Sequence, residues 1–175
     1  MPSIDSFRKE FAAYRPISAT GLCLVSNSKV GTTKLLAFLR QHRLAVEASV
    51  SPAHTPQAAV VGIAVTDRFE IVFDTVDSTR KAHNLRRNPR LAFVIGGLTK
   101  GEERTVQYEG VADEPSGAEL ERLKAIYYSV YPDGPSRLSW PGLIYVRVRP
   151  IWIRYTDYTV EPTEIVEFSA EDLLA

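Results

Sequence analysis

The stretch VFDTVDSTRKAHNLRRNPRLAFVI, residues 72–95, joins two apolar runs through a turn and a short helix. The first run ends at Thr75, the helix opens with Thr79, Arg80 and Lys81, and an Asn-Pro pair stops it before the second run. Cations in the first turn of a helix face the positive end of its dipole, which disfavours each of them by about 0.3–1 kcal/mol. The placement of Arg80 and Lys81 therefore needs a reason.

A bound anion is one such reason. Asp77 or Ser78 is predicted to cap the helix, so its free backbone N–H groups point outward from a strand-to-helix turn, where an anion binds readily. Arg80 would grip a phosphate as a bidentate fork and Lys81 as a point charge. A solvated basic helix face is the alternative, because further cations extend the run: Arg86, Arg87 and Arg90.

The composition is that of a soluble globular protein. The chain has 175 residues, 45% of them apolar and 24% charged, which is enough for one domain with a core. Its 21 acidic and 21 basic residues give no net charge, which argues against a nucleic-acid binder. We expect no membrane span, since no apolar run reaches about 18 residues, and no signal peptide, and therefore a cytoplasmic protein. The single cysteine, Cys23, excludes an internal disulfide.

Apolar periodicity predicts a mainly β protein with flanking helices. Helices are expected at residues 4–13, 32–42, 79–88 and 117–131, with Thr32 or Thr33 capping the second. Strands are expected at residues 44–51, 57–65, 69–75, 90–97, 104–113, 143–150, 151–159 and 164–168. The run 57–65 is nearly all apolar, as in a strand covered on both faces. Short strands with hairpin-length turns favour one antiparallel barrel spanning residues 1–175.

Several chemical motifs are missing. The stretch SNSKVGTTK, residues 26–34, lacks both the first Gly of a phosphate loop and the Lys directly after its second Gly. His42, His54 and His83 have no metal-ligand spacing, so no metal site is expected. There is no G-x-S-x-G elbow and no local pair of acids, and we assign no catalytic side chain.

The segment STRKAHNLRRNPRLAFVI, preceded by VFDT, resembles the pyridoxamine 5′-phosphate oxidase-like superfamily of flavin-binding split barrels. The resemblance continues upstream through LAVEASVSPAHTPQAAVVGIAV and downstream through ERTVQYEGVAD, over about residues 33–131. It implies a six-stranded antiparallel split β-barrel that dimerises, with flavin mononucleotide (FMN) at the subunit interface. The implied function is an FMN-dependent oxidoreductase acting on an unidentified small molecule or electron donor. A non-catalytic flavin carrier, a redox sensor, and a split barrel using a deazaflavin or haem are the alternatives.

The resemblance also implies which residues bind the cofactor. Arg80 and Lys81 would hold the FMN phosphate, with help from the strand end and turn before them: Asp74, Thr75, Ser78 and Thr79. One strand would offer its main chain to the isoalloxazine ring: Ala59, Val60, Val61 and Gly62, the glycine permitting close approach. Thr105 and Gln107 would point toward the ring edge.

The sequence departs from true pyridoxamine phosphate oxidases at the substrate. Those enzymes carry an R-x-V-L-L-K type strand, whose arginine reaches the phosphate and whose lysine binds substrate. Ala58 and Ile63 or Ala64 stand in those places, and the C-terminal R-L-H-type run is absent, with Trp152 and Arg154 as a loose counterpart. Oxidation of vitamin B6 is therefore not expected.

Overall fold

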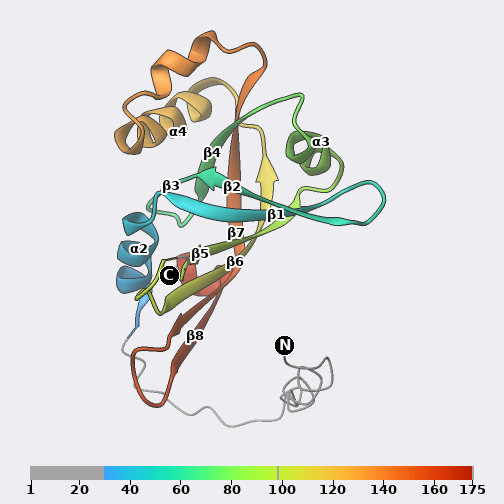
Figure 1. Cartoon of the computed structure of the whole chain (residues 1–175). Coiled ribbons are helices and arrows are strands. Elements are labelled where there is room, and N and C mark those ends of the chain that lie inside the picture. The colour runs from blue at the N-terminus through green and yellow to red at the C-terminus, as the bar shows by residue number, and fades with distance from the viewer. Residues whose placement is uncertain (1–29, 98, 175) are drawn as a thin grey trace.

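An antiparallel sheet curls into a half-open barrel, with helices on its outside (Figure 1). The structure, a computed structural model, describes residues 30–97 and 99–174; the helix predicted at residues 4–13 and Cys23 lie outside this part. The elements in chain order are α2 (Thr32–Gln41), β1 (Leu44–Val50), β2 (Pro56–Gly62), β3 (Ala64–Val65), β4 (Ile71–Val76), α3 (Arg80–Arg87), β5 (Arg90–Gly96), β6 (Arg104–Asp113), α4 (Gly117–Val130), the 3-10 helix η1 (Gly134–Ser139), β7 (Leu143–Asp157), β8 (Glu164–Ser169) and α5 (Ala170–Leu174).

The strand order is β2-β1-β5-β6-β7-β4-β3, and β8 pairs with the second half of β7. Since β2 and β3 are separated only by Ile63, the two ends of this path meet and the sheet turns back on itself. Six strands, β1, β2, β4, β5, β6 and β7, form the barrel; the two-residue β3 and the strand β8, which pairs only with β7, are additions to it. The mainly β split-barrel fold predicted from the sequence is confirmed.

Three of the predicted strands, at residues 57–65, 143–150 and 151–159, have different bounds in the structure. The run 57–65 is not one strand, because the chain leaves β2 at Gly62 and enters β3 at Ala64. Residues 143–157 form one strand instead of two. The pairing steps from Glu109–Trp152 to Gly110–Pro150, so Ile151 is an extra residue that lets β7 continue past a proline lacking an N–H group.

The helix caps also differ from the predictions. Gly31 precedes α2 and makes no side-chain cap bond, so neither Thr32 nor Thr33 is the cap. Thr79 caps α3: its backbone is extended and its Oγ1 accepts a hydrogen bond from the Ala82 N–H at 3.3 Å. The cap predicted at Asp77 or Ser78 was wrong by one or two residues. Every helix in the described ranges is too short or too polar to cross a bilayer.

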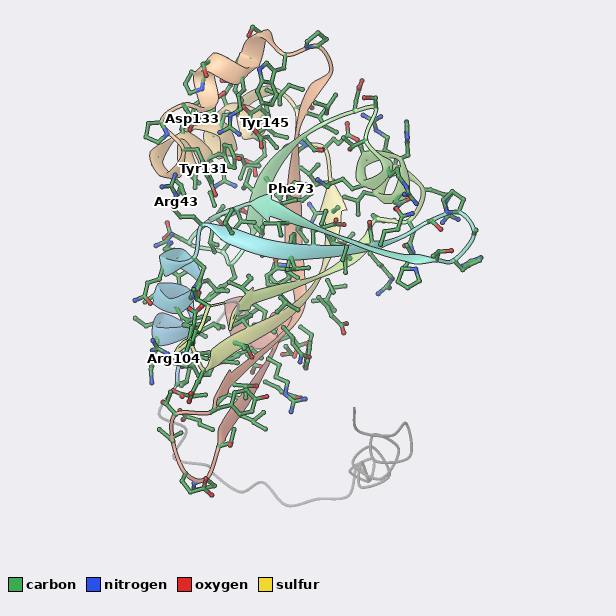
Figure 2. The ribbon with its side chains drawn as sticks, in the orientation of Figure 1. Arg43, Phe73, Arg104, Tyr131, Asp133 and Tyr145 are labelled. Atoms are coloured by element: carbon green, nitrogen blue, oxygen red, sulfur yellow. The ribbon has the colours of Figure 1, made fainter. Side chains whose placement is uncertain are left out.

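Two apolar clusters lie on opposite sides of β4. Its alternating side chains send Phe73 into the barrel core and Val72 toward α4. In the core, Phe93 makes edge-to-face contacts with Phe73 and Tyr108. Figure 2 shows the second cluster at the upper end of the molecule, where tyrosines from α4 and β7 meet. These aromatic contacts fix α4 and η1 to one side of the barrel. On another side α3 packs on β1 and β6, apart from the other helices (Figure 1).

Candidate functional site

A cleft of about 610 Å³ lies between the start of α3 and strands β1 and β2. Such a volume falls within the range of small-molecule and cofactor sites, about 300–1,000 Å³. The cleft is lined by residues of three elements, principally Thr79, Arg80 and Lys81 at the start of α3, Gln57 and Ala59 of β2, and Glu47 of β1. Four of the predicted cofactor-binding residues therefore line one cleft: Ala59, Thr79, Arg80 and Lys81.

Arg80 and Lys81 lie at the end of α3 where cations are least stable. No described acidic residue forms an ion pair with either of them, although most other arginines of the described chain are paired. The side-chain amide of Gln57 lies between Asn84 and Arg80: in one orientation its oxygen accepts from Asn84, and in the opposite orientation its oxygen accepts from Arg80 Nε at 3.2 Å. The first backbone N–H groups of a helix also lack intrahelical acceptors. The cleft thus gathers positive charge and free donors, as an anion site requires.

Beside the cleft, polar side chains of α3, β1 and β2 are joined by hydrogen bonds. Asn84 of α3 is buried and donates from Nδ2 to Ser49 Oγ at 3.3 Å and to Gln57 Oε1 at 3.0 Å. These bonds hold α3 against β1 and β2. Glu47, next to Ser49 on the same face of β1, is only 1% exposed, and its Oε1 has no hydrogen-bond partner in the described chain.

Thr75 and Asp74 point in opposite directions from the end of β4. Thr75 Oγ1 lies 3.2 Å from Thr79 Oγ1, so its side chain supports the cap of α3 beside the cleft. Asp74 turns toward α4 and η1, where it accepts hydrogen bonds from the Tyr127 hydroxyl at 2.8 Å and from Arg137 Nη1 at 2.7 Å. These contacts account for Asp74 without a cofactor, and Ser78 is exposed in the turn.

The remaining predicted residues do not line this cleft. Val61 is buried in the core, and a Cβ on Gly62 would lie 2.8 Å from the hydroxyl of Tyr131, so the glycine already accommodates a side chain of α4's end. Three others share the outer face of the sheet: Val60, Thr105 and Gln107. Val60 is 63% exposed. Trp152 and Arg154 lie in β7, opposite Glu109 and Gln107.

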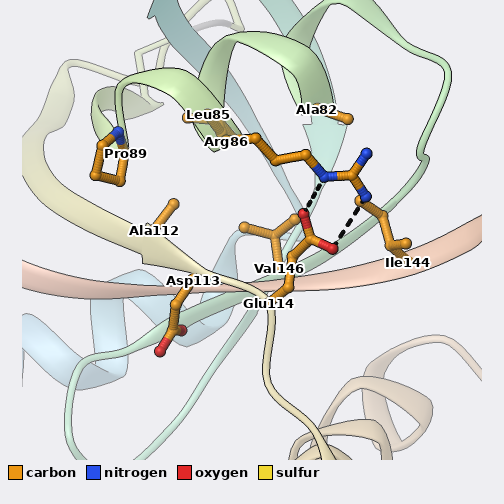
Figure 3. Close-up of a pocket in the computed structure, with 9 residues that line it drawn as sticks. All are labelled: Ala82, Leu85, Arg86, Pro89, Ala112, Asp113, Glu114, Ile144 and Val146. Atoms are coloured by element: carbon orange, nitrogen blue, oxygen red, sulfur yellow. Dashed lines mark hydrogen bonds and ion pairs between the residues drawn. The ribbon is translucent and has the colours of Figure 1, made fainter.

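A second cavity, of about 230 Å³, lies on the other side of α3, against β6 and β7 (Figure 3). Its walls are mostly apolar, and its charged residues are already paired: Arg86 holds Glu114 through two hydrogen bonds of 2.6 and 3.0 Å, and Asp113 binds arginines of β7. This cavity offers a charged ligand nothing unpaired. Within the described ranges, no three His, Cys, Asp or Glu side chains gather as a metal site would need.

Sequence analysis missed Glu47, Ser49, Gln57 and Asn84. A signal for the first was present: in LAVEASV the odd-numbered positions Ala45, Glu47 and Ser49 share one face, and that face is buried. An acid there breaks the apolar alternation and marks a site. Gln57 and Asn84 carry no comparable signal, because their roles depend on how α3 packs on β1 and β2.

Comparison with known structures places the fold among several kinds of protein. A haem-binding protein from Mycobacterium smegmatis superimposes with a TM-score of 0.71 at 16% identity, over 83% of this chain and 60% of that one, so this chain spans less than two thirds of its length. The haem storage protein HutZ from Vibrio cholerae gives 0.60 at 12% identity, over 78% and 92%. A pyridoxamine 5′-phosphate oxidase-related, FMN-binding protein from Nostoc punctiforme gives 0.53 at 13% identity, over 73% and 86%.

These identities are too low to show more than a shared fold. Comparison with curated proteins gave no match. A family model does match, however, and it covers residues 32–157, from the start of α2 to the end of β7. That span contains all six barrel strands, together with every residue that lines the cleft, and leaves out β8. The chain therefore belongs to the pyridoxamine 5′-phosphate oxidase family.

Proposed function

We propose that this protein binds FMN in the cleft at the start of α3 and acts as an FMN-dependent oxidoreductase on a small molecule. The observation that carries the proposal is the pair Arg80 and Lys81: two cations without acidic partners, at the positive end of a helix, facing a cleft of cofactor size. A dianionic phosphate turns this unfavourable arrangement into a favourable one. The donor set fits the group, since Thr79, Arg80 and Lys81 all offer donors to it.

The chain's own residues would bind and orient the cofactor. Bound flavin supplies the electron chemistry, so no acid or base of the protein is required for it. Arg80 and Lys81 would hold the phosphate, and Thr75 would keep Thr79 in place through their 3.2 Å hydroxyl contact. The main chain of β2 at Ala59, which lines the cleft, would contact the isoalloxazine ring.

The proposal includes a homodimer formed through the outer face of β1, β2 and β5. This outer face is apolar over three adjacent strands: Leu44, Val46, Ala48, Ala58, Val60, Ala92 and Val94. A second copy covering it would explain why the run 57–65 is apolar on both faces although β2 is half-exposed. Gln107 pairs with Val94 across β5 and β6, so the partner's cleft would gain Gln107 and Thr105 from this face.

Dimerisation is tested by Val60→Asp, which places a charge at the centre of the outer face and should give a monomer in light scattering after size exclusion. Val160→Asp is the matched control, because Val160 is exposed in the β7–β8 connection, away from this face. A Val60→Asp protein that stays dimeric would exclude the outer face as the interface.

FMN binding is tested with the purified full chain. We expect a flavin absorption band and a higher melting temperature with FMN, because a ligand that binds only the native state stabilises it by mass action. Riboflavin, a deazaflavin, haem and pyridoxal phosphate complete the panel. Turnover with nicotinamide donors then separates an oxidoreductase from a flavin carrier or redox sensor. A protein that shows neither a flavin absorption band nor a higher melting temperature with FMN would refute the proposal.

Haem is the second candidate, because two of the similar structures are those of haem proteins. A haem iron needs an axial ligand, and the three histidines are the candidates for it. His42 is held by the Phe38 carbonyl and by Glu102, whereas His54 is exposed in the β1–β2 turn. His83 is exposed on α3 and is the histidine nearest in sequence to Arg80 and Lys81. A haem absorption spectrum that changes in His83→Ala would favour this candidate over FMN.

A further inference from the structure

Glu47 is a buried acid on the inner face of β1, the face that also carries Ser49. Its direct cross-strand neighbours are Ala59 of β2 and Phe93 of β5, and neither can pair with a carboxyl group. The side chain is 1% exposed, and Oε1 has no hydrogen-bond partner in the described chain. An unsatisfied buried carboxyl is costly, and where one is found in a native structure it calls for an explanation.

The surroundings of Glu47 favour its neutral form. Burial raises the pKa of the Glu47 carboxyl, while a hydrogen bond from Ser49 and the charge of Lys81 oppose this shift without cancelling it. The titratable groups lining the cleft with Glu47 are Arg80 and Lys81, both on α3; β2 contributes Gln57 and Ala59, and β5 contributes Phe93. Ser49 already accepts from Asn84, which leaves its own O–H free for Glu47.

A neutral carboxyl is a donor as well as an acceptor. Glu47 lines the same cleft as the start of α3, and the small side chain of Ala59 leaves the space beside it open. An anion held by Arg80 and Lys81 would therefore meet either a protonated Glu47, which can donate an O–H···O⁻ bond, or an ionised one, which repels it. Bonds of that kind are among the strongest hydrogen bonds in proteins.

We propose that Glu47 is the third ligand of the phosphate, beside Arg80 and Lys81, and that its protonated carboxyl donates a hydrogen bond to the phosphate. Binding of a phosphate-bearing cofactor is then coupled to the protonation of Glu47. The inference rests on the proposed function and gives the cleft a pH dependence. Where Glu47 is ionised in the free protein, binding takes up one proton from solvent. Affinity for FMN then falls as pH rises, by up to about tenfold per pH unit once the carboxyl titrates.

The test measures the FMN dissociation constant from about pH 4.5, the ordinary pKa of a glutamate, up to about pH 9, because burial raises the pKa of Glu47 above that ordinary value. The second ionisation of the phosphate, near pH 6, acts in the opposite direction because it strengthens attraction to the two cations. The decisive variant is therefore Glu47→Gln, which is nearly the same size, keeps an N–H donor and cannot ionise. It should bind FMN without the loss of affinity at high pH.

Glu47→Leu removes the donor and should weaken FMN binding by about 10- to 100-fold at pH 6, as for a lost hydrogen bond to a charged group. Glu121→Gln is the control, since Glu121 pairs with Lys124 on the exposed side of α4. Riboflavin has the same ring and polyol without the phosphate, so its affinity should not depend on Glu47. Proton uptake on FMN binding, measured calorimetrically in buffers of different ionisation enthalpy, should disappear in Glu47→Gln.

The outcomes separate the two proposals. FMN bound with the same pH profile by the unmodified protein and by Glu47→Gln overturns the role of Glu47 and leaves the FMN site standing. An equal effect on riboflavin also overturns it, because Glu47 would then act on the ring, the polyol or the fold. Absence of FMN binding by the unmodified protein overturns the proposed function itself.

Discussion

The cations at α3 and those between α4 and the barrel contrast sharply. Arg147 of β7 is 15% exposed and binds acids on three sides: Asp113 through Nε and Nη2 at 2.9 and 2.6 Å, Glu119 at 2.7 Å and Glu70 at 3.6 Å. Arg137 similarly holds Asp74. By comparison, Arg80 and Lys81 face a cleft with no described acidic partner except the electrostatic influence of Glu47.

The difference distinguishes structural charges from those available to a ligand. A buried ion pair keeps its partners occupied, so it can tie α4 to the barrel but has nothing left to bind. Cations at a helix N-terminus face the positive end of the helix dipole, so those without an acidic partner remain available to bind an anion. The contrast can be tested experimentally, because variants in the ion-paired region should change stability, whereas variants at the start of α3 should change ligand affinity.

The largest expected effect is on the paired side. Arg147→Ala removes two hydrogen bonds from Asp113 and leaves Glu70, whose side chain is 6% exposed, with Arg122 as its remaining cation, so it should lower the free energy of unfolding by about 3 kcal/mol. Arg149→Ala is the matched control: Arg149 binds the same Asp113 at 2.9 Å but is 50% exposed, so its loss should cost about 1 kcal/mol or less. Urea unfolding measures both, and equal losses would show that burial does not set the difference.

The double variant Arg80→Ala with Lys81→Ala should do the opposite. We expect FMN affinity to fall by at least about 100-fold, two charge-assisted contacts being lost, while stability without ligand stays the same or rises slightly. Lys34→Ala is the control, since Lys34 also lies in the first turn of a helix, α2, but away from the cleft. It should share the stability effect only. Unaltered FMN affinity in the double variant would remove the basis of the proposed site.

The sequence alone predicts the two unpaired cations, but it does not predict the residues that surround them. A cation in the first turn of a helix is a local conflict, visible in STRKA without any tertiary contact. The ends of most barrel strands are local features too, since turns and apolar alternation mark them, but the break at Ile63 has no such mark. The roles of Asn84 and Gln57, and the turn of Asp74 toward Arg137, depend on which residues distant in sequence meet. The sequence predicts a strand end at Pro150 because the bulge at the next residue, Ile151, has no sequence signature of its own.

The two regions should also respond to pH with opposite sign. The hydrogen bond from Arg122 holds the pKa of Glu119 down to about 2, against an ordinary value of 4.5. Glu119 therefore stabilises the fold above about pH 4.5, and this contribution is lost as pH falls toward 2. Burial raises the pKa of Glu47 in the folded protein. The stability of the fold therefore falls as pH rises above the pKa that this carboxyl has in the unfolded chain.

Unfolding free energies measured across pH should show both trends. Glu119→Gln should flatten the acid side of the profile, and Glu47→Gln should raise stability at neutral pH. A Glu47→Gln protein no more stable than the unmodified chain at pH 7 would mean that the buried carboxyl is solvated or paired in solution.

The smallest expected effect concerns the cap of α3, where the two kinds of residue meet. Thr79 accepts from the Ala82 N–H and touches the Thr75 hydroxyl, so Thr79→Ala should cost about 1 kcal/mol. Thr79→Ser keeps the oxygen and should recover most of it. Ser78→Ala, one residue earlier and exposed, should stay within about 0.5 kcal/mol. Because the cap orients the first turn, Thr79→Ala should also weaken FMN binding, though less than loss of the cations does. If Ser78→Ala lowers the free energy of unfolding more than Thr79→Ala does, Ser78 and not Thr79 is the cap of α3. The side chains of Arg80 and Lys81 would then leave the helix in a different direction.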